Sequence, residues 1–320
     1  MHKIVIYFDG GGGGIRAGAS INGLEEAHKD FAGITPGEGS LVDYLANVVS
    51  TFANEFEGDI WRAVLAVATL PADAESYQGI ANLVFRNSKV KELWICSDSV
   101  SSCAATIAAD GVVITAGTGI TALAVGKSGT ILHSLSGDGH LIGDVASAYW
   151  IGRMGLNSAV RSSDGRDQTP GAAQLLEVAC QHFKADPYHL PHIVHQSTRA
   201  VHAIAQFAQL VNNLASSGNA KALEIIDLAG DEITLIANTA KRVCEGGKDF
   251  QVALLGGVLA EDTMIYKNAV SKIQSGGMQL HKSKNTPLDG AKILANKVAG
   301  FPSGPSMRLS NGAVAGSSPI

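Results

Sequence analysis

The stretch IVIYFDGGGGGIRAGASING, residues 4–23, contains the feature that decides the fold: an acid followed by five glycines. Residues 3–8 form an apolar run that predicts a buried strand, and residues 15–21 alternate with period two as its hairpin partner. Gly10 to Gly14 would then connect two strands. Glycines without Cβ atoms allow backbone N–H groups to converge on a phosphate oxygen. Taken alone, such a turn is more often a plain hairpin.

A second stretch, GVVITAGTGITALAVGKSGTILHSLSG at residues 111–137, restarts the same pattern. A strand at 111–116 leads into a glycine turn, followed by strands at 120–125 and 130–135. Two copies of strand, glycine turn, strand, turn and strand indicate an internal duplication. Each copy would begin one lobe, and the two glycine turns would hold a polyphosphate from both sides. The sequence therefore predicts a two-lobe α/β protein.

The composition sets limits on the class of protein. The chain has 320 residues, is 46% hydrophobic and carries a net charge of −5. That length favours two domains, and the absence of a basic run argues against nucleic-acid binding. No stretch reaches the ~18 apolar residues of a membrane span. Because a strand pattern starts at once, with no apolar leader, we expect a cytoplasmic protein. The dispersed cysteines are expected to be buried free thiols: Cys96, Cys103, Cys180 and Cys244.

The remaining elements follow from periodicity and capping signals. Ser40, with Asp43 three residues later, predicts the start of a helix. Further strands are predicted at 25–32, 62–69, 91–97 and 250–255, and further helices at 73–84, 99–109, 170–183, 197–215, 219–244 and 289–299. We assign residues 1–108 and 289–302 to an N-terminal lobe, residues 109–288 to a C-terminal lobe, and residues 303–320 to a tail without regular structure.

Two aspartates lie at predicted strand ends. Asp9 precedes the first glycine turn, where it either initiates the turn or holds Mg²⁺ through water beside phosphates; the paired turns favour the metal role. Asp98 ends the strand at 91–97 and enters a helix. It either caps that helix or accepts a proton from a substrate hydroxyl, because strand ends of α/β sheets point into the ligand crevice. The sequence leaves both alternatives for Asp98 open.

Two further glycine-rich stretches contain candidate ligand contacts. In SGDGHLIGDVASAYWIGR, residues 136–153, Asp144 either caps the following helix or binds sugar hydroxyls, and His140 is expected to be a structural hydrogen-bonding residue. Gly256 and Gly257 follow the strand at 250–255. They permit the close backbone approach that an adenine ring needs, or form an ordinary turn.

In their order and spacing, six motifs resemble the actin-like ATPase superfamily, and within it the BadF/BadG/BcrA/BcrD-type ATPase family, most closely its N-acetylglucosamine kinase branch. The resemblance covers about residues 3–299. It implies a ribonuclease H-like fold of duplicated mixed sheets flanked by helices, phosphorylation of an amino sugar by ATP and Mg²⁺, and a homodimer. The motifs are DGGGGGIRAG, AGTG, GHLIGDVASAYWIG, LNSAVRSSDGRD, LLGGVL and TPLDGAKILA.

The resemblance also implies site roles by position. Asp98 would be the general base that activates the sugar hydroxyl, and Asp9 would hold the metal ion. Asp144, with Gly137 and Asp138, would bind the sugar. The nucleotide would contact two phosphate loops and an adenosine motif formed by Gly10, Gly11, Gly12, Gly13, Gly117, Thr118, Gly119, Gly256 and Gly257.

The sequence departs from the family pattern at several of these positions. Gly13 and Gly14 stand where the first loop of the family has threonine and a basic residue, and Ile120 replaces a serine after the second loop. Asp138 occupies the place of a tryptophan. A sugar kinase of altered preference fits this pattern, and so does a sensor that binds nucleotide or sugar without turnover. An ATPase that activates a dehydratase through an iron–sulfur cluster would need clustered cysteines.

Overall fold

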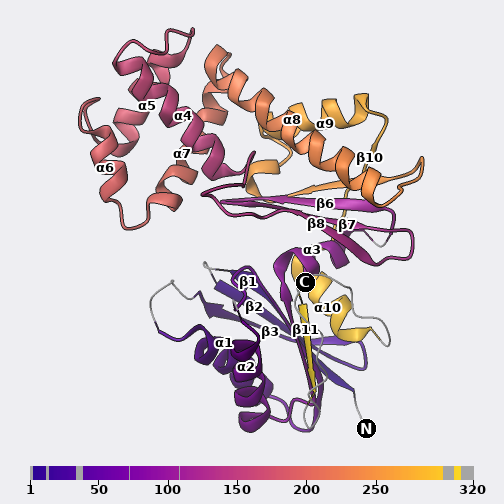
Figure 1. The fold of residues 1–320 in the computed structure, drawn as a ribbon. Coiled ribbons are helices and arrows are strands. Elements are labelled where there is room, and N and C mark those ends of the chain that lie inside the picture. The colour runs from indigo at the N-terminus through magenta and orange to yellow at the C-terminus, as the bar shows by residue number, and fades with distance from the viewer. Residues whose placement is uncertain are drawn as a thin grey trace. The chain divides into compact units, whose positions relative to one another are not determined.

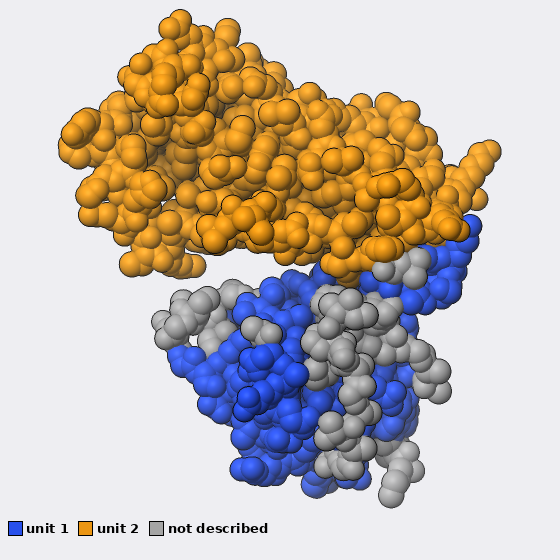
Figure 2. Space-filling model, viewed as in Figure 1, with its two compact units in different colours: residues 1–109, 125–132, 282–320 blue, residues 110–124, 133–281 orange. Residues whose placement is uncertain are grey.

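The computed structural model describes residues 3–11, 14–33, 39–71, 73–107, 109–297 and 306–310. The chain divides into two compact units, coloured in Figure 2. The first contains residues 1–109, 125–132 and 282–320, and the second contains residues 110–124 and 133–281. Each unit combines one sheet with helices, so the predicted α/β class is confirmed.

The bounds of the units differ from the predicted lobes at two segments, which we placed in the C-terminal lobe. Residues 282–288 group with the first unit because Ser283 Oγ and Asn285 Nδ2 donate hydrogen bonds to the Ala105 carbonyl. Residues 125–132 also group with it, and Gly129 lines a small cavity of about 140 Å³ together with Val100. Each of these two segments is placed in the first unit by contacts with residues distant in the sequence, and local periodicity does not predict such contacts.

The first unit is built on a six-stranded sheet in the order β11-β5-β4-β1-β2-β3. The hairpin of β1 and β2 is the predicted one, and its two strands pair in antiparallel register from Ile4–Ile21 to Gly11–Gly14. β4 and β5 extend the sheet in parallel with β1. The strands are β1 (Ile4–Gly11), β2 (Gly14–Ile21), β3 (Leu24–Ala32), β4 (Ile60–Val67), β5 (Glu92–Ser97) and β11 (Ser306–Ser310).

β11 corrects the prediction that residues 303–320 form a tail without regular structure. Ser306–Ser310 pair in antiparallel fashion with β5, from Ser306–Cys96 to Ser310–Glu92. The sequence pattern gave no signal because this strand is stabilised by pairing with a segment about two hundred residues earlier.

Helices cover both faces of this sheet (Figure 1). α1 (Leu41–Ala53) and α2 (Ala74–Asn87) pack on the face that carries Ile6 and Phe8 of β1. Asp43 N donates to Ser40 Oγ at 3.2 Å, as the capping signal predicts. α3 (Asp98–Thr106) and α10 (Pro287–Asn296) contact β1 and each other.

α10 approaches α3 closely at Gly290. A Cβ atom on Gly290 would overlap the Ser101 carbonyl oxygen of α3, so any side chain there would push the two helices apart. The glycine in TPLDGAKILA therefore has a packing reason. Thr286 and Asp289 form a reciprocal capping box at the start of this helix.

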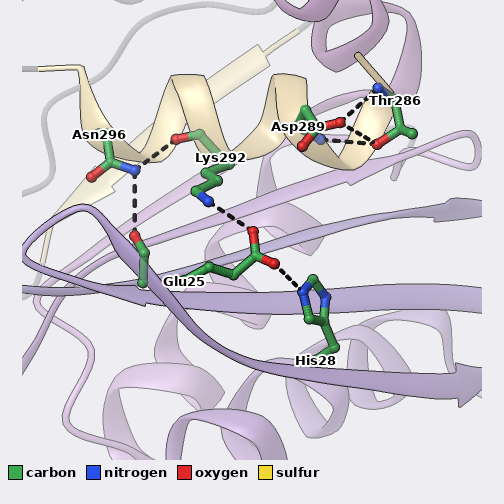
Figure 3. Close-up of polar contacts among 7 residues, drawn as sticks. Glu25, His28, Thr286, Asp289, Lys292 and Asn296 are labelled. Atoms are coloured by element: carbon green, nitrogen blue, oxygen red, sulfur yellow. Dashed lines mark hydrogen bonds and ion pairs between the residues drawn. The ribbon is translucent and has the colours of Figure 1, made fainter. Parts of the chain in front are cut away.

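A polar network joins α10 to strands β2 and β3 (Figure 3). Glu25 accepts hydrogen bonds from Lys292 Nζ at 2.7 Å and from His28 at 2.5 Å. These bonds, from Lys292 first and then His28, lower the pKa of Glu25 to about 2. Asn296 Nδ2 donates to Ser20 Oγ at 3.4 Å further along the same helix. The network fixes the rotation of α10 above the hairpin.

The second unit contains a five-stranded sheet in the order β10-β9-β6-β7-β8. β9 lies between β6 and β10 and runs parallel to both. The observed β6 and β7 coincide with the predicted strands. The strands are β6 (Gly111–Ala116), β7 (Ile120–Val125), β8 (Ile131–Ser136), β9 (Gln251–Leu255) and β10 (Gln279–Leu280).

The helices of the second unit lie together on one side of its sheet (Figure 1). The prediction that a helix starts at Pro170 is wrong by two residues, because Gly171 adopts a left-handed φ of 96° at the N-cap. The helices are α4 (Ala148–Ser163), α5 (Ala172–Phe183), α6 (Leu190–Gln196), α7 (Ala200–Ser216), α8 (Ala220–Val243), α9 (Met264–Ser275) and the 3₁₀ helix η1 (Gly257–Leu259). Within the described ranges, we find no helix that is both long and apolar enough to span a bilayer.

Candidate active site

Asp9 and Asp98 lie at the same edge of the first sheet. β1, β4 and β5 are parallel, and their register aligns Gly10 with Val67 and Val67 with Ser97. Asp9 is one residue before this row and Asp98 is one residue after it. The structure therefore brings together the two acids that the sequence predicted at strand ends.

Asp9 is held in place by two donors. It is 3% exposed. Its Oδ2 accepts from Arg16 Nη2 at 2.8 Å and its Oδ1 accepts from Ser101 Oγ at 3.1 Å. Asp9 lies within β1, directly opposite Arg16 of β2, so it is a strand residue and does not initiate a turn.

Asp98 is the first residue of α3, but it does not cap that helix. The N-cap is Ser97, whose Oγ accepts from Ser99 N at 3.2 Å, so the capping alternative for Asp98 is wrong. The half-buried carboxylate accepts a hydrogen bond from Ser97 Oγ at 3.2 Å. Burial raises the pKa of Asp98 above its ordinary value, although the bond from Ser97 opposes the shift. A carboxylate of raised pKa accepts a proton more readily.

The charge of Asp98 also affects the pKa of Asp9. Burial raises the pKa of Asp9. The hydrogen bonds from Arg16 and Ser101 oppose this increase, and the negative charge of Asp98 adds to it.

In the described part of the chain, no three histidine, cysteine, aspartate or glutamate side chains are placed to hold a metal ion. One or two carboxylates nevertheless fit Mg²⁺, which keeps several waters and takes its remaining ligands from substrate phosphates.

The first glycine loop is described only in part. Gly12 and Gly13 lie outside the described residues. A Cβ on Gly10 would overlap the carbonyl oxygen of Gly14, so close contact within the hairpin itself requires glycine there. Gly11 pairs with Gly14 at the end of the two strands. At Gly10 the structure thus provides a packing reason in addition to the predicted ligand reason.

The second glycine turn, Gly117 to Gly119, supports the start of α4. The Gly117 carbonyl accepts from Ala148 N at 2.9 Å, and the Thr118 carbonyl accepts from Tyr149 N at 3.2 Å. These bonds use N–H groups of the first helical turn that lack partners inside the helix. The turn is thereby fixed, while the Thr118 side chain stays exposed.

Asp144 lies against this same turn. It is 8% exposed, and its Oδ1 accepts from Ile120 N at 3.5 Å. Its Oδ2 lies 2.9 Å from the position that a Cβ on Gly119 would occupy. The predicted alternative that Asp144 caps the next helix is wrong, because Ser147 Oγ accepts from Trp150 N at 3.2 Å and fills that role.

The segment after β8 leaves Asp138 accessible. Gly137 has a φ of 84°, and both Gly137 and Asp138 are exposed. Leu141 and Ile142, further along the same loop, are 85% and 89% exposed. His140 makes an edge contact with the Tyr149 ring at 5.1 Å between centroids. The role of Gly137 and Asp138 in sugar binding stays a prediction.

A cavity of about 500 Å³ in the second unit brings two predicted motifs together. Gly117 of the glycine turn and Gly257 of the adenosine motif both line it. The neighbouring Gly256 has a φ of 94°, and a Cβ there would overlap the Ala116 carbonyl oxygen. The fold therefore requires glycine at 256, whereas a Cβ on Gly257 meets no atom within 4 Å. The cavity has the size of a small-molecule site.

Sequence reasoning missed the amide side chains of this cavity. Gln206, Gln209 and Asn212 of α7 line it, as does His182 of α5. The three amide residues recur every third position on a predicted helix, and this spacing is the signal that could have identified them. Asn212 Oδ1 is already engaged as an acceptor from Met264 N at 2.8 Å, and Gln209 Nε2 donates to Asn213 Oδ1 at 3.0 Å. Gln206 is therefore the best candidate in the lining for a hydrogen bond to a ligand.

These features define an α/β fold of the actin-like ATPase and sugar kinase type, and solved structures confirm it. A proposed N-acetylglucosamine kinase from Chromobacterium violaceum is 17% identical, with a TM-score of 0.68 over 92% of this chain and 99% of that one. A second, from Porphyromonas gingivalis, is 15% identical, with a TM-score of 0.66 over 91% and 97%. The ROK hexokinase of Thermus thermophilus is also 15% identical, with a TM-score of 0.55 over 91% and 97%.

Sequence comparison identifies the family. A profile of the BadF/BadG/BcrA/BcrD ATPase family matches residues 41–295. The N-acetylmuramic acid/N-acetylglucosamine kinase of Clostridium acetobutylicum is 23% identical over 305 residues, which cover 92% of this chain and 98% of that relative. The chain belongs to the BadF/BadG/BcrA/BcrD ATPase family, as the sequence motifs predicted.

Proposed function

We propose that this protein is an ATP-dependent kinase that phosphorylates a hydroxyl group of an amino sugar related to N-acetylglucosamine. The observation that carries the proposal is Asp98, a half-buried carboxylate of raised pKa at the carboxyl end of a parallel strand. Family membership supports the use of ATP. The name of the Clostridium acetobutylicum relative supports the class of sugar.

In this mechanism Asp98 is the general base. Its ionised carboxylate accepts the proton of the sugar hydroxyl as the hydroxyl oxygen bonds to the terminal phosphorus of ATP. The bond between that phosphorus and the bridging oxygen breaks, and ADP leaves. The hydrogen bond from Ser97 Oγ orients the carboxylate. Asp9, held by Arg16 and Ser101, would bind Mg²⁺ through water, and the bound ion would neutralise phosphate charge.

The second unit would bind the nucleotide. Thr118 and Gly119 would present backbone N–H groups to phosphate, whereas the Gly117 N–H donates to the Gly119 carbonyl at 2.9 Å and closes the turn. The cavity next to Gly257 would accept the adenosine. Asp144 would orient the second glycine turn through Ile120 N. A contact of Asp144 with the sugar, together with Gly137 and Asp138, remains part of the proposal, as do the homodimer and the cytoplasmic location.

The direct test is phosphorylation of a panel of sugars. Purified protein with ATP and Mg²⁺ would be incubated with glucosamine, N-acetylglucosamine and N-acetylmuramic acid, and products detected by mass spectrometry. A sugar phosphate supports the kinase. Binding of ATP and sugar by calorimetry without product would favour the sensor, which the absence of threonine and a basic residue at Gly13 and Gly14 makes the second candidate.

An iron–sulfur ATPase of the dehydratase-activating kind has weaker support. Cys96, Cys103 and Cys244 are buried, as predicted, and Cys180 is half-buried. Burial raises the pKa of each of these thiols, which disfavours the thiolate that a cluster needs. Iron analysis of anaerobically purified protein would detect a cluster directly.

The raised pKa of Asp98 predicts the pH dependence of activity. The base acts only when ionised, so kcat/KM should fall as the pH decreases through its pKa, with the slope of a single proton. Because burial raises that pKa, the decline should begin at a higher pH than for an ordinary aspartate, whose pKa is about 4. Initial rates measured between about pH 4 and 8 would check this. A flat profile down to about pH 4 would contradict it.

Gly256 and Gly257 offer a matched pair of variants for nucleotide binding. Gly257→Val adds a side chain where a Cβ has free space beside the cavity, so it should weaken ATP binding about tenfold or more with little change in Tm. Gly256→Ala should instead lower the Tm by several degrees, because its Cβ overlaps the Ala116 carbonyl and its φ is 94°. Calorimetry and thermal unfolding separate the two effects. Unchanged ATP affinity in Gly257→Val would count against an adenosine site here.

A further inference from the structure

The first unit contains a cavity of about 350 Å³ between helices α1 and α2, here called the α1–α2 cavity. Its volume is that of a small-molecule site. α1 and α2 pack on the sheet face that carries Phe8, whereas Asp9, the next residue, projects from the opposite face and contacts Ser101 of α3. The sheet therefore separates this cavity from Asp9 of the candidate active site. Its polar lining residues are Asp43, Asn47, Ser50, Thr51, Asn54 and Asn87.

Ser50 is a buried polar residue of this lining without a partner. It is 6% exposed, and its Oγ makes no hydrogen bond to any described residue. A buried hydroxyl without a partner costs free energy. The Oγ is covered in this conformation, but a serine hydroxyl has three staggered positions about the Cα–Cβ bond, so it can turn toward a ligand. A ligand that exchanges hydrogen bonds with Ser50 would recover the cost.

The neighbouring polar side chains keep unused hydrogen-bonding capacity. Thr51 Oγ1 donates to Asn47 Oδ1 at 3.4 Å, while Asn47 Nδ2 makes no hydrogen bond within the described ranges. Asn54 caps the end of α1, and its Nδ2 donates to the Asn87 carbonyl at the end of α2, at 3.0 Å. This bond ties the two helix ends together at the cavity. The site is thus held in shape while Asn47, Ser50 and Thr51 can bond to a ligand.

The charge of the lining restricts the class of ligand. Asp43 is its one charged residue among those described, and no lysine or arginine lines the cavity. Phosphates and other anions therefore lack a cation to bind. Sugar hydroxyls both donate and accept hydrogen bonds, as do the amide and hydroxyl side chains here. Leu83 of α2 adds an apolar contact for the C–H groups of such a ligand.

We propose that the α1–α2 cavity binds an uncharged polyhydroxylated molecule, a sugar or a polyol, as a second ligand site of this protein. Asn47, Ser50 and Thr51 exchange hydrogen bonds with its hydroxyl groups, and the Asp43 carboxylate accepts a further one. The site belongs to none of the sequence motifs and does not depend on the kinase activity.

The alternative is that water alone fills the cavity. Its volume corresponds to about ten water molecules at ~30 Å³ each. In that case the polar side chains only hydrate the two helices. A sugar or polyol would then leave the signals of α1 unchanged.

The test is an NMR titration of ¹⁵N-labelled protein with glucose, N-acetylglucosamine and sorbitol, with glucose 6-phosphate as the anionic comparison. Amide signals of residues 43–54 report on the α1–α2 cavity, and those near Asp98 and Asp144 report separately on the candidate active site. At least one uncharged probe should shift the signals of α1 to saturation. Glucose 6-phosphate should bind there more weakly than glucose, because its charge meets Asp43 and no cation.

Two variants assign the contacts. Ser50→Ala should weaken probe binding at α1 about three- to tenfold, while the Tm stays the same or rises, because the lost hydroxyl has no partner in the fold. Asn47→Ala, at an exposed position, should weaken binding by a similar factor. Asn82→Ala is the matched control. Asn82 accepts from Gln78 within α2 at 2.9 Å, as Asn47 accepts from Thr51 within α1, but it does not line the cavity.

Each outcome decides the inference. Saturable shifts in α1 that weaken in Ser50→Ala and Asn47→Ala, but not in Asn82→Ala, support it. No saturable shift in α1 with any uncharged probe overturns it, and so do shifts that both cavity variants leave unchanged. Binding of glucose 6-phosphate as tight as that of glucose overturns the class of ligand. The kinase proposal stands or falls separately, on the formation of a sugar phosphate.

Discussion

Replacement of Asp98 by asparagine should lower the kcat for sugar phosphorylation by about 10²–10⁴-fold, the usual contribution of a positioned general base. The amide has nearly the shape of the carboxylate and can still accept the hydrogen bond from Ser97 Oγ, but it cannot take up the proton of the sugar hydroxyl. Affinity for ATP should change little. The loss would therefore appear in kcat, measured with saturating ATP and sugar.

The same variant should be at least as stable as the unsubstituted protein at neutral pH. Burial raises the pKa of Asp98 in the folded state, so the ionised carboxylate opposes folding, and this cost is present above the folded-state pKa. Asparagine removes the cost. The stability difference should vanish as the pH falls below the unfolded-state pKa of about 4, where both states are protonated. Thermal unfolding across that range measures it.

Asp59→Asn provides the control for Asp98→Asn. Asp59 is an exposed aspartate of the same unit, paired with Lys91 at 3.2 Å. Its substitution should leave both kcat and Tm close to those of the unsubstituted protein, because exposed ion pairs contribute little. Near-normal phosphorylation by Asp98→Asn would remove the base assignment. A large loss of Tm in that variant would instead indicate a structural role.

Replacement of Arg62 by methionine should lower the free energy of unfolding by about 3–5 kcal/mol. Arg62 is 3% exposed in β4, and its Nε donates to Glu92 Oε2 at 2.6 Å. The guanidinium stacks on the Trp94 ring at 3.7 Å from the centroid. Its Nη1 donates to the carbonyls of Ala295 and Lys297, at 3.3 Å and 2.7 Å, and so caps the end of α10. Methionine fills the volume but removes the buried donor from Glu92, which keeps only its ion pair with the more exposed Arg308, and leaves these carbonyls without that donor.

Urea unfolding would measure the loss, and a double variant would assign its cause. In Arg62→Met with Glu92→Leu, no buried carboxylate is left beside an apolar side chain, so part of the lost stability should return. A loss of less than about 1 kcal/mol in the single variant would contradict the prediction. A double variant no more stable than Arg62→Met would assign the loss to the cap of α10 and the stacking on Trp94.

The secondary structure was largely predictable because its signals are local. The strands at 111–116 and 120–125 are observed where alternation placed them, and Ser40 caps α1 as its spacing to Asp43 indicated. The start of α5 was missed because Gly171 takes a left-handed φ. β11 was missed because its pairing with β5 is a long-range contact.

The candidate site was predictable to the same extent. Asp9 and Asp98 were found because a polar residue at the end of an apolar strand is a local pattern. The residue that caps α3 was not predictable from the sequence. Only the backbone conformation decides whether Ser97 or Asp98 accepts a hydrogen bond from the first free N–H of the helix. The Arg16–Asp9 pair depends on hairpin register, and the amides of α7 depend on the packing of that helix beside Gly257.

By itself, the sequence determined the α/β class, the repeated strand–glycine–strand pattern and the family, since these follow from residue order and hydrophobic period. Only the tertiary structure decided that Asp144 supports the second glycine turn, that Arg62 holds the end of α10, and that a solvent-facing Arg16 is anchored on a buried Asp9. Each of these depends on which distant side chains the fold brings within hydrogen-bonding distance. Burial, which raises the pKa of Asp98, is likewise a property of the packed chain.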